Sequence, residues 1–155
     1  MAPTIMLSEE VRADPERACD ILRDWRCWPR TFPSTIAAVN LIERSNKSIT
    51  LQILHRTEGP VINILNPDEC GAVRLREFKP RYDAEFTFFS MPAQAGSTLH
   101  VHGSIWLKGP LAWLGCLLAP LIRRRMRRYL LEPLRVRAER HQPQDANRPN
   151  IGETP

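Results

Sequence analysis

Six apolar residues recur at every fourth position near the end of the chain and define one amphipathic helix. They are Leu114, Leu118, Ile122, Met126, Leu130 and Leu134. Side chains four residues apart lie on the same face of an α-helix, so the pattern predicts a single long helix over residues 111–140. We expect Pro120 and Pro133 to bend it, because proline lacks the backbone N–H that a helix uses. A helix of this kind must bury its apolar face against another layer of structure.

The preceding part of the chain has the pattern of short strands separated by turn residues. Alternating apolar residues predict seven strands, of which the first is the weakest. The ranges are Thr4 to Ala13, Ala37 to Arg44, Ser48 to Thr57, Val61 to Leu65, Ala72 to Lys79, Tyr82 to Met91 and Ser97 to Leu107. Turn residues at 45–47 and 93–96 predict hairpins, so we expect an antiparallel meander.

Helical signals follow the first predicted strand. Asp14 supplies an N-cap oxygen and Pro15 suits the first helical position, which together predict a helix over about 15–24. Aromatic residues and prolines at 25–34 predict a short, packed helical turn. The fold class is therefore α+β, with one domain over residues 1–140. Residues 141–155 are polar and proline-rich, and we expect them to form a disordered tail.

The positive charge of the chain is concentrated in the predicted long helix. The net charge is +5, and residues 123–140 alone contain eight arginines against two glutamates. Arg123, Arg124, Arg127 and Arg128 directly follow an apolar stretch, which is typical of a helix that rests on anionic lipid head groups. A solvated helix face is the alternative. Nucleic acid is a less favoured partner, because no base-stacking platform or recognised motif accompanies the arginines.

Several functional classes are disfavoured by the sequence. The four cysteines show no C-x-x-C spacing, which argues against a zinc ribbon or a disulfide-stapled miniprotein. The chain begins without the basic and apolar regions of a signal peptide, so we expect a cytoplasmic protein, with contact to the membrane surface as an alternative. No P-loop, G-x-G-x-x-G or G-x-S-x-G is present, and we expect neither a nucleotide cofactor nor a hydrolase triad.

Three segments of the chain are informative when taken together, ADPERACDILRDWRCWPRTFP, GSTLHVHGSIWLKGP and LAWLGCLLAPLIRRRMRRYLLEPLRVRAER. In this order they resemble the START-like, helix-grip superfamily, also called SRPBCC. The resemblance covers roughly residues 4–140 and is greatest to the polyketide cyclase and lipid-transport, coenzyme-Q-binding branch. It implies a curved antiparallel sheet of six to seven strands wrapped around a long C-terminal helix, with two short helices after the first strand. It also implies an apolar cavity between the sheet and the helix.

The resemblance implies binding of a hydrophobic or aromatic small molecule, such as a polyketide, a lipid or a quinone. Two alternatives remain open. The chain could be a polyketide cyclase or aromatase that catalyses an aldol-type cyclisation or dehydration. It could instead be a peripheral membrane or interaction protein that acts through its basic helix.

Strand alternation assigns candidate residues to the cavity. His55 shares a face with Leu51 and Ile53, Glu77 shares a face with Val73 and Leu75, and Tyr82 shares a face with Phe86 and Phe88. The polar candidates His55, Glu77 and Tyr82 could orient ligand oxygens or move a proton. Alternatively they are ordinary boundary residues, since one β-bulge would reverse the alternation. Phe86 and Phe88 are the candidate apolar contacts with the ligand from the sheet. The resemblance implies that the first half of the long helix faces the cavity, which adds Trp113, Leu117 and Pro120 as candidate contacts.

His100 and His102 have a spacing that could hold a metal ion on one face of a strand. They alternate with Leu99 and Val101, however, which are expected to face the core. The histidines should therefore lie on the solvent side of the sheet, and we expect no metal site.

Overall fold

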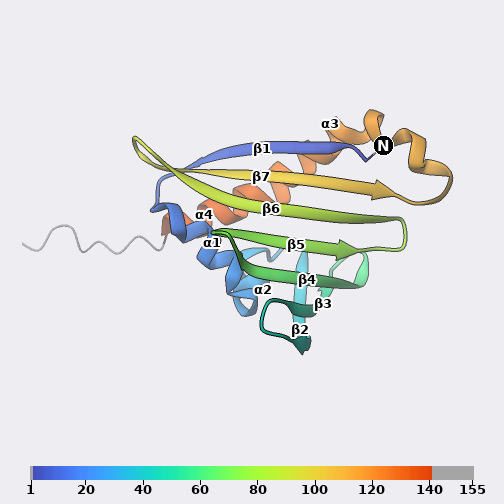
Figure 1. Cartoon of the computed structure of the whole chain (residues 1–155), viewed down its shortest axis with the longest axis horizontal. Coiled ribbons are helices and arrows are strands. Elements are labelled where there is room, and N and C mark those ends of the chain that lie inside the picture. Colours follow the sequence, from blue (N-terminus) through green and yellow to red (C-terminus); the bar gives the residue numbers. More distant parts are fainter. Residues whose placement is uncertain (1, 141–155) are drawn as a thin grey trace, which may run out of the picture.

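One antiparallel sheet organises the chain. The computed structural model describes residues 2–140, so the predicted tail at 141–155 lies outside the described residues. Within the described range, seven strands lie in the order β1-β7-β6-β5-β4-β3-β2 (Figure 1). The strands are β1 (Thr4–Val11), β2 (Ile36–Arg44), β3 (Ile49–His55), β4 (Gly59–Glu69), β5 (Ala72–Phe78), β6 (Tyr82–Ala93) and β7 (Gly96–Leu107). Strands β2 to β7 form the predicted meander, and β1 closes it beside β7.

The helices lie in two groups along the chain. The first group follows β1 and the second follows β7. The first contains α1 (Pro15–Arg23), η1 (Trp25–Cys27) and α2 (Trp28–Thr31), and the second contains η2 (Gly109–Leu114), α3 (Gly115–Met126), η3 (Arg127–Leu131) and α4 (Glu132–Arg140). The chain thus has the predicted curved sheet with short helices after β1 and a long C-terminal helix.

Two local predictions about the helices differ from the structure in detail. The Asp14 side chain makes no capping hydrogen bond within residues 2–140; instead its backbone carbonyl accepts a hydrogen bond of 3.0 Å from the Arg17 N–H. The predicted bend at Pro133 coincides with a π-helical turn, η3, directly before it. Proline cannot donate to the carbonyl four residues earlier, and a wider turn accommodates that loss. At Pro120, α3 continues without interruption.

The core is most complete where α4 covers the sheet. Figure 1 shows α4 beside α1 at one end of the sheet and α3 beside β1 at the other, and the contacts between these elements agree. Leu131, Leu134 and Ala138 are fully buried. In α3, by contrast, only Gly115 and Met126 are buried. The C-terminal helix is therefore anchored by its second half and held more loosely by its first.

None of the helices within residues 2–140 is both long enough and apolar enough to cross a lipid bilayer.

Candidate functional site

Three residues that strand alternation assigned to the cavity come together at one end of the sheet's inner face, the face covered by the helices. His55 ends β3, Glu77 lies near the end of β5, and Tyr82 begins β6. The distance from His55 Nε2 to Glu77 Oε1 is 3.6 Å. The alternation survives to the strand ends because the registers of β3 with β4 and of β5 with β6 contain no bulge.

Two further charged residues complete this group. Lys79 Nζ lies 3.1 Å from Glu77 Oε1 and 5.0 Å from the centre of the Tyr82 ring. The same ammonium donates to Glu58, which belongs to the turn between β3 and β4. We call His55, Glu58, Glu77, Lys79 and Tyr82 the inner-face polar cluster. Only 18%, 14% and 10% of the His55, Glu77 and Lys79 side chains are exposed, so their charges interact in a poorly hydrated place.

This environment shifts the pKa values of His55, Lys79 and Tyr82, and that of Glu58 as well. Burial lowers the pKa of His55, and the nearby Glu77 opposes that change only in part. Burial would also lower the pKa of Lys79, but the charge of Glu77 and hydrogen bonds with Glu58 and Tyr82 raise it above the ordinary value. Burial and the charge of Glu77 raise the pKa of Tyr82. At neutral pH the cluster therefore presents a neutral imidazole, an ammonium and a neutral phenol.

Partial burial acts to raise the pKa of Glu58, but the hydrogen bond and the charge of Lys79 outweigh it and hold this pKa below its usual value. The charge of Arg125 acts in the same direction. The charge at the end of α3 is thus within electrostatic reach of the β3–β4 turn.

Two buried polar atoms in or beside the cluster lack a partner. Within residues 2–140, His55 Nε2 and Asn63 Nδ2 are buried and make no hydrogen bond. Asn63 is only 1% exposed, and its β4 position pairs with Glu77 of β5. Directly opposed residues on one face of a sheet are neighbours, so the Asn63 amide adjoins the cluster. A buried amide without a partner is costly, and a ligand oxygen would satisfy it.

An apolar surface extends from the cluster along β6. Ala84 pairs with Glu77, and the rings of Phe86 and Phe88 follow, with their centres 6.5 Å apart. Phe86 lies over Gly103 of β7, where a Cβ atom would come within 2.6 Å of the ring. Phe86 is 8% exposed and Phe88 is fully buried. The predicted placement of both phenylalanines on the inner face is thus seen, and both pack within the core.

Trp113, Leu117 and Pro120 lie elsewhere. Trp113 is 75% exposed and Leu117 is 72% exposed, and Pro120 is also exposed. They lie on the side of the helix opposite the buried Gly115 and Met126. The expectation that this half of the helix turns them toward the inner face is wrong, because Gly115, Ile122 and Met126 occupy the inward side of α3.

The histidines of β7 lie on the outer face of the sheet, as predicted from the alternation. Phe89 stacks on His100 at 5.0 Å and meets His102 edge-on at 5.3 Å. In the part of the chain that the structure describes, no three His, Cys, Asp or Glu side chains are grouped so that they could hold a metal ion.

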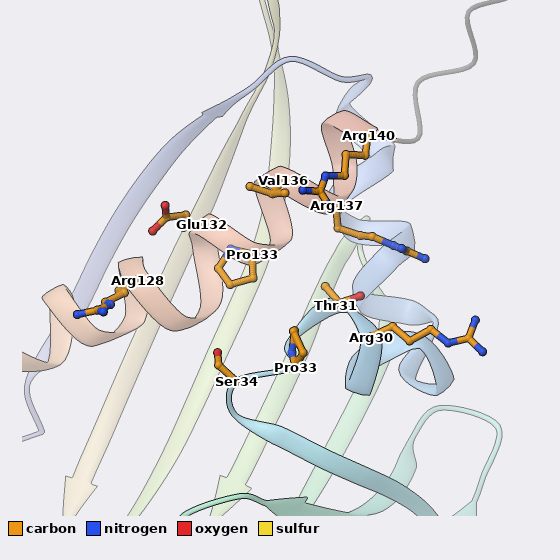
Figure 2. Close-up of a pocket in the computed structure, with 10 residues that line it drawn as sticks. All are labelled: Arg30, Thr31, Pro33, Ser34, Arg128, Glu132, Pro133, Val136, Arg137 and Arg140. Atoms are coloured by element: carbon orange, nitrogen blue, oxygen red, sulfur yellow. The ribbon is translucent and has the colours of Figure 1, made fainter.

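A groove lies between α4 and the loop that follows α2 (Figure 2). Its volume is about 330 Å³. The groove is lined by Arg30, Thr31, Pro33, Ser34, Arg128, Glu132, Pro133, Val136, Arg137 and Arg140. Figure 2 shows Arg30 and Arg137 extending to the same side, whereas Arg128 points away from them, so the arginines do not converge on one point.

A second hollow of about 330 Å³ lies between α1 and α4 and is lined by Arg17, Asp20, Ile21, Asp24, Cys27 and Arg137. Neither hollow is the apolar cavity expected between the sheet and the long helix. At the end covered by α4, that space is filled by side chains such as Phe88 and Leu134.

No protein-family model and no curated protein matches this sequence. Solved structures do match its fold. A START superfamily protein from Mycobacterium smegmatis superposes with a TM-score of 0.66 at 18% identity, over 90% of this chain and 99% of that one. The chain has the START-like helix-grip fold.

Two enzymes share this START-like fold with the chain. The Streptomyces aromatase/cyclase Zhui matches with a TM-score of 0.71 at 12% identity, over 90% of this chain and 95% of that one. A truncated norcoclaurine synthase from Thalictrum flavum matches with a TM-score of 0.68 at 11% identity, over 92% and 96%. At these identities the likeness concerns the fold alone, since one fold hosts several activities.

Sequence reasoning missed Asn63, Lys79 and Glu58. The alternation could have found two of them, because Asn63 lies between Val61 and Leu65 in β4 and Lys79 lies two residues beyond Glu77. Glu58 lies in a turn, where no alternation applies.

Proposed function

We propose that this protein binds a hydrophobic or aromatic small molecule that carries oxygen substituents, between the inner face of the sheet and α3. The observation that carries the proposal is the inner-face polar cluster, where His55 Nε2 and the adjoining Asn63 Nδ2 are buried without a partner among residues 2–140. A mostly apolar site with a few convergent polar groups is the usual form of a small-molecule site.

The chemistry of the cluster sets the expected ligand. Asn63 Nδ2 would donate to a carbonyl, hydroxyl or carboxylate oxygen of the ligand. Tyr82 and the neutral His55 each can donate to or accept from a second oxygen. The rest of the ligand would pack against the apolar side chains of Ala84 and Phe86. Polyketides, quinones and lipid head regions all combine these two features.

Space for the ligand is expected to come from displacement of α3. That helix buries only Gly115 and Met126, whereas Leu131 and Leu134 fix the following segment in the core. Elements with few buried apolar contacts open at a lower free energy than the core. Outward motion of α3 would open space beside the cluster without disturbing α4. The aromatase/cyclase among the structural neighbours supports a polycyclic or aromatic ligand.

Methyl-resolved NMR tests the proposal. Labelled protein is titrated separately with the anthraquinone emodin, a short-chain ubiquinone and oleate, one compound for each ligand class. We expect at least one to shift the methyl signals of the inner-face residues Leu51 and Ile53. The outer-face residues Leu54, also on β3, and Ile62, on the neighbouring β4, should not respond. Shifts confined to Leu54 and Ile62, or none with any compound, would contradict the proposal.

A second candidate function is aldol-type cyclisation, favoured by the neutral His55 beside Glu77. In this reaction His55 would accept a proton from a carbon between two ketones. The resulting enolate carbon would attack a distant carbonyl, and Tyr82 would donate a proton to the oxygen formed there. His55→Gln and Tyr82→Phe should then abolish turnover of a poly-β-ketone while changing its affinity by less than about tenfold. An unchanged product profile would exclude catalysis by these residues.

A further inference from the structure

The end of η2 and the outer side of α3 carry an apolar stripe that no other element among residues 2–140 covers. Trp113, Leu117 and Leu121 are 75%, 72% and 55% exposed. Leu117 and Leu121 are four residues apart, so they lie on one side of α3, opposite the buried Gly115 and Met126. Trp113 precedes them at the same spacing in η2. We call Trp113, Leu117 and Leu121 the outer stripe. Exposed apolar side chains that adjoin one another indicate a surface that contacts something other than water.

Positive charge continues the outer stripe along the helix. Arg124 and Arg128 occupy the next positions on the same side, and Arg123, Arg125 and Arg127 flank them, all exposed. The sequence contains no acidic residue between Gly109 and Leu131. Within residues 2–140, the arginines that form ion pairs are others, in α1, β5 and α4. The surface thus combines exposed apolar side chains with five arginines whose charges are not neutralised by a contacting carboxylate of the described residues.

We propose that this side of α3 docks on the surface of an anionic lipid bilayer. In that arrangement Trp113, Leu117 and Leu121 enter the boundary between head groups and acyl chains. Arg124 and Arg128 reach the lipid phosphates and carboxylates, as basic residues beside an apolar face do. The proposal does not depend on which small molecule the inner face binds, because it uses the opposite side of the helix.

The position of α3 suits a flat partner. Figure 1 shows η2 and α3 at the margin of the molecule, beside the edge strand β1. The exposure of the outer stripe at this margin leaves it accessible to a bilayer.

Other occupants fit this surface less well. A nucleic acid would pair with the arginines but would leave Leu117 and Leu121 in water, since its affinity comes from phosphate contacts. A second copy of the chain would bring Arg124 and Arg128 against identical arginines, and like charges across an interface are strongly unfavourable. An anionic bilayer satisfies both the stripe and the charges.

Co-sedimentation with vesicles tests the proposal. The full chain is mixed with vesicles of phosphatidylserine and phosphatidylcholine, and in parallel with vesicles of phosphatidylcholine alone. We expect binding to the mixed vesicles and weaker binding to the neutral ones. Arg124→Gln with Arg128→Gln should reduce the affinity about 25-fold, from about fivefold for each arginine. Leu117→Ser with Leu121→Ser should reduce it by at least about tenfold.

A matched control variant changes exposed methionines of the sheet. Met6 and Met91 are 63% and 53% exposed on β1 and β6, and Met6→Ser with Met91→Ser should leave binding unchanged. Fluorescence adds a second measurement: brominated lipids should quench the wild-type tryptophan emission, and Trp113→Phe should abolish that quenching. Circular dichroism spectra of the variants serve as the check that each variant is folded.

The proposal is overturned if wild-type protein fails to bind the mixed vesicles, or if binding is unaffected by the variants of the outer stripe and the arginines. It is equally overturned if duplex DNA binds the protein while the vesicles do not, or if sedimentation equilibrium shows a dimer that the same substitutions dissociate.

Discussion

His55 Nε2 lies 3.6 Å from Glu77 Oε1, on the two strands that flank β4. The distance is too long for a hydrogen bond, so the carboxylate does not hold a proton on the imidazole. Burial instead lowers the pKa of His55 below its ordinary value of 6.5. The cluster therefore contains a buried neutral histidine whose protonation opposes folding.

The first prediction concerns pH. In the unfolded chain His55 binds a proton near its ordinary pKa of 6.5, whereas in the folded chain burial lowers this pKa. Just below pH 6.5 the unfolded state therefore binds more protons than the folded state. The free energy of unfolding should be at its full value above that pH and should fall as the pH decreases below it. His55→Gln should reduce this dependence in urea denaturation at a series of pH values. The control His102→Gln, on the exposed outer face, should retain it. Equal slopes for wild type and His55→Gln would contradict the prediction.

Lys79 should contribute to stability through its two carboxylate partners. Lys79→Met removes the ammonium from between Glu58 and Glu77 and leaves Glu77 largely buried without its cation. We expect a loss of about 2 kcal/mol, the usual contribution of a hydrogen bond to a charged group. The control Lys108→Met removes the more exposed pair with Asp83 and should cost less than about 1 kcal/mol. Chemical denaturation measures both, and equal losses would argue against a buried cluster.

The C-terminal helix should owe its attachment to η3 and α4. Leu131→Ala opens a cavity at a fully buried position and should cost about 2–5 kcal/mol. Leu117→Ala changes a residue that is 72% exposed and should shift stability by less than about 0.5 kcal/mol. Thermal denaturation of the two variants provides the comparison. A large loss for Leu117→Ala would mean that α3 is packed more tightly than its exposure indicates.

Gly103 should control the position of the Phe86 ring. A Cβ atom in Gly103→Ala would lie 2.6 Å from the ring, so Phe86 must move toward the helix. We expect a loss of about 1–3 kcal/mol from the crowding. The aromatic signals of Phe86 in NMR spectra should shift as well. Unchanged stability together with unchanged signals would show that the ring does not lie over Gly103.

The polar part of the candidate site could be predicted from the sequence because strand alternation is local. His55 and Glu77 follow a regular run of alternating residues and Tyr82 precedes one, and no bulge intervenes between those runs and the strand ends. Glu58 could not be predicted in this way, because a turn residue acquires its place only when β3 and β4 pair.

The helix was predicted less completely, and the reason is its pitch. The stripe at every fourth position correctly placed Met126 and Leu134 in the core. The same pattern predicts Leu130 at the inward position, but the fully buried residue there is Leu131. The difference arises because the π-helical turn η3 adds one residue before Pro133. Trp113 and Leu117 are each one residue ahead of the stripe, a rotation of about 100° that turns them toward solvent.

Isothermal titration calorimetry of wild type and cluster variants tests ligand binding at the inner face most directly. The panel is emodin, short-chain ubiquinone and oleate, and the variants are Asn63→Leu, Tyr82→Phe and the outer-face control His102→Gln. We expect at least one compound to bind wild type and His102→Gln equally. Its affinity should fall about tenfold for Asn63→Leu or Tyr82→Phe, the cost of one lost buried hydrogen bond. Failure of all three compounds to bind, or equal affinity for wild type and both cluster variants, would contradict the proposed function.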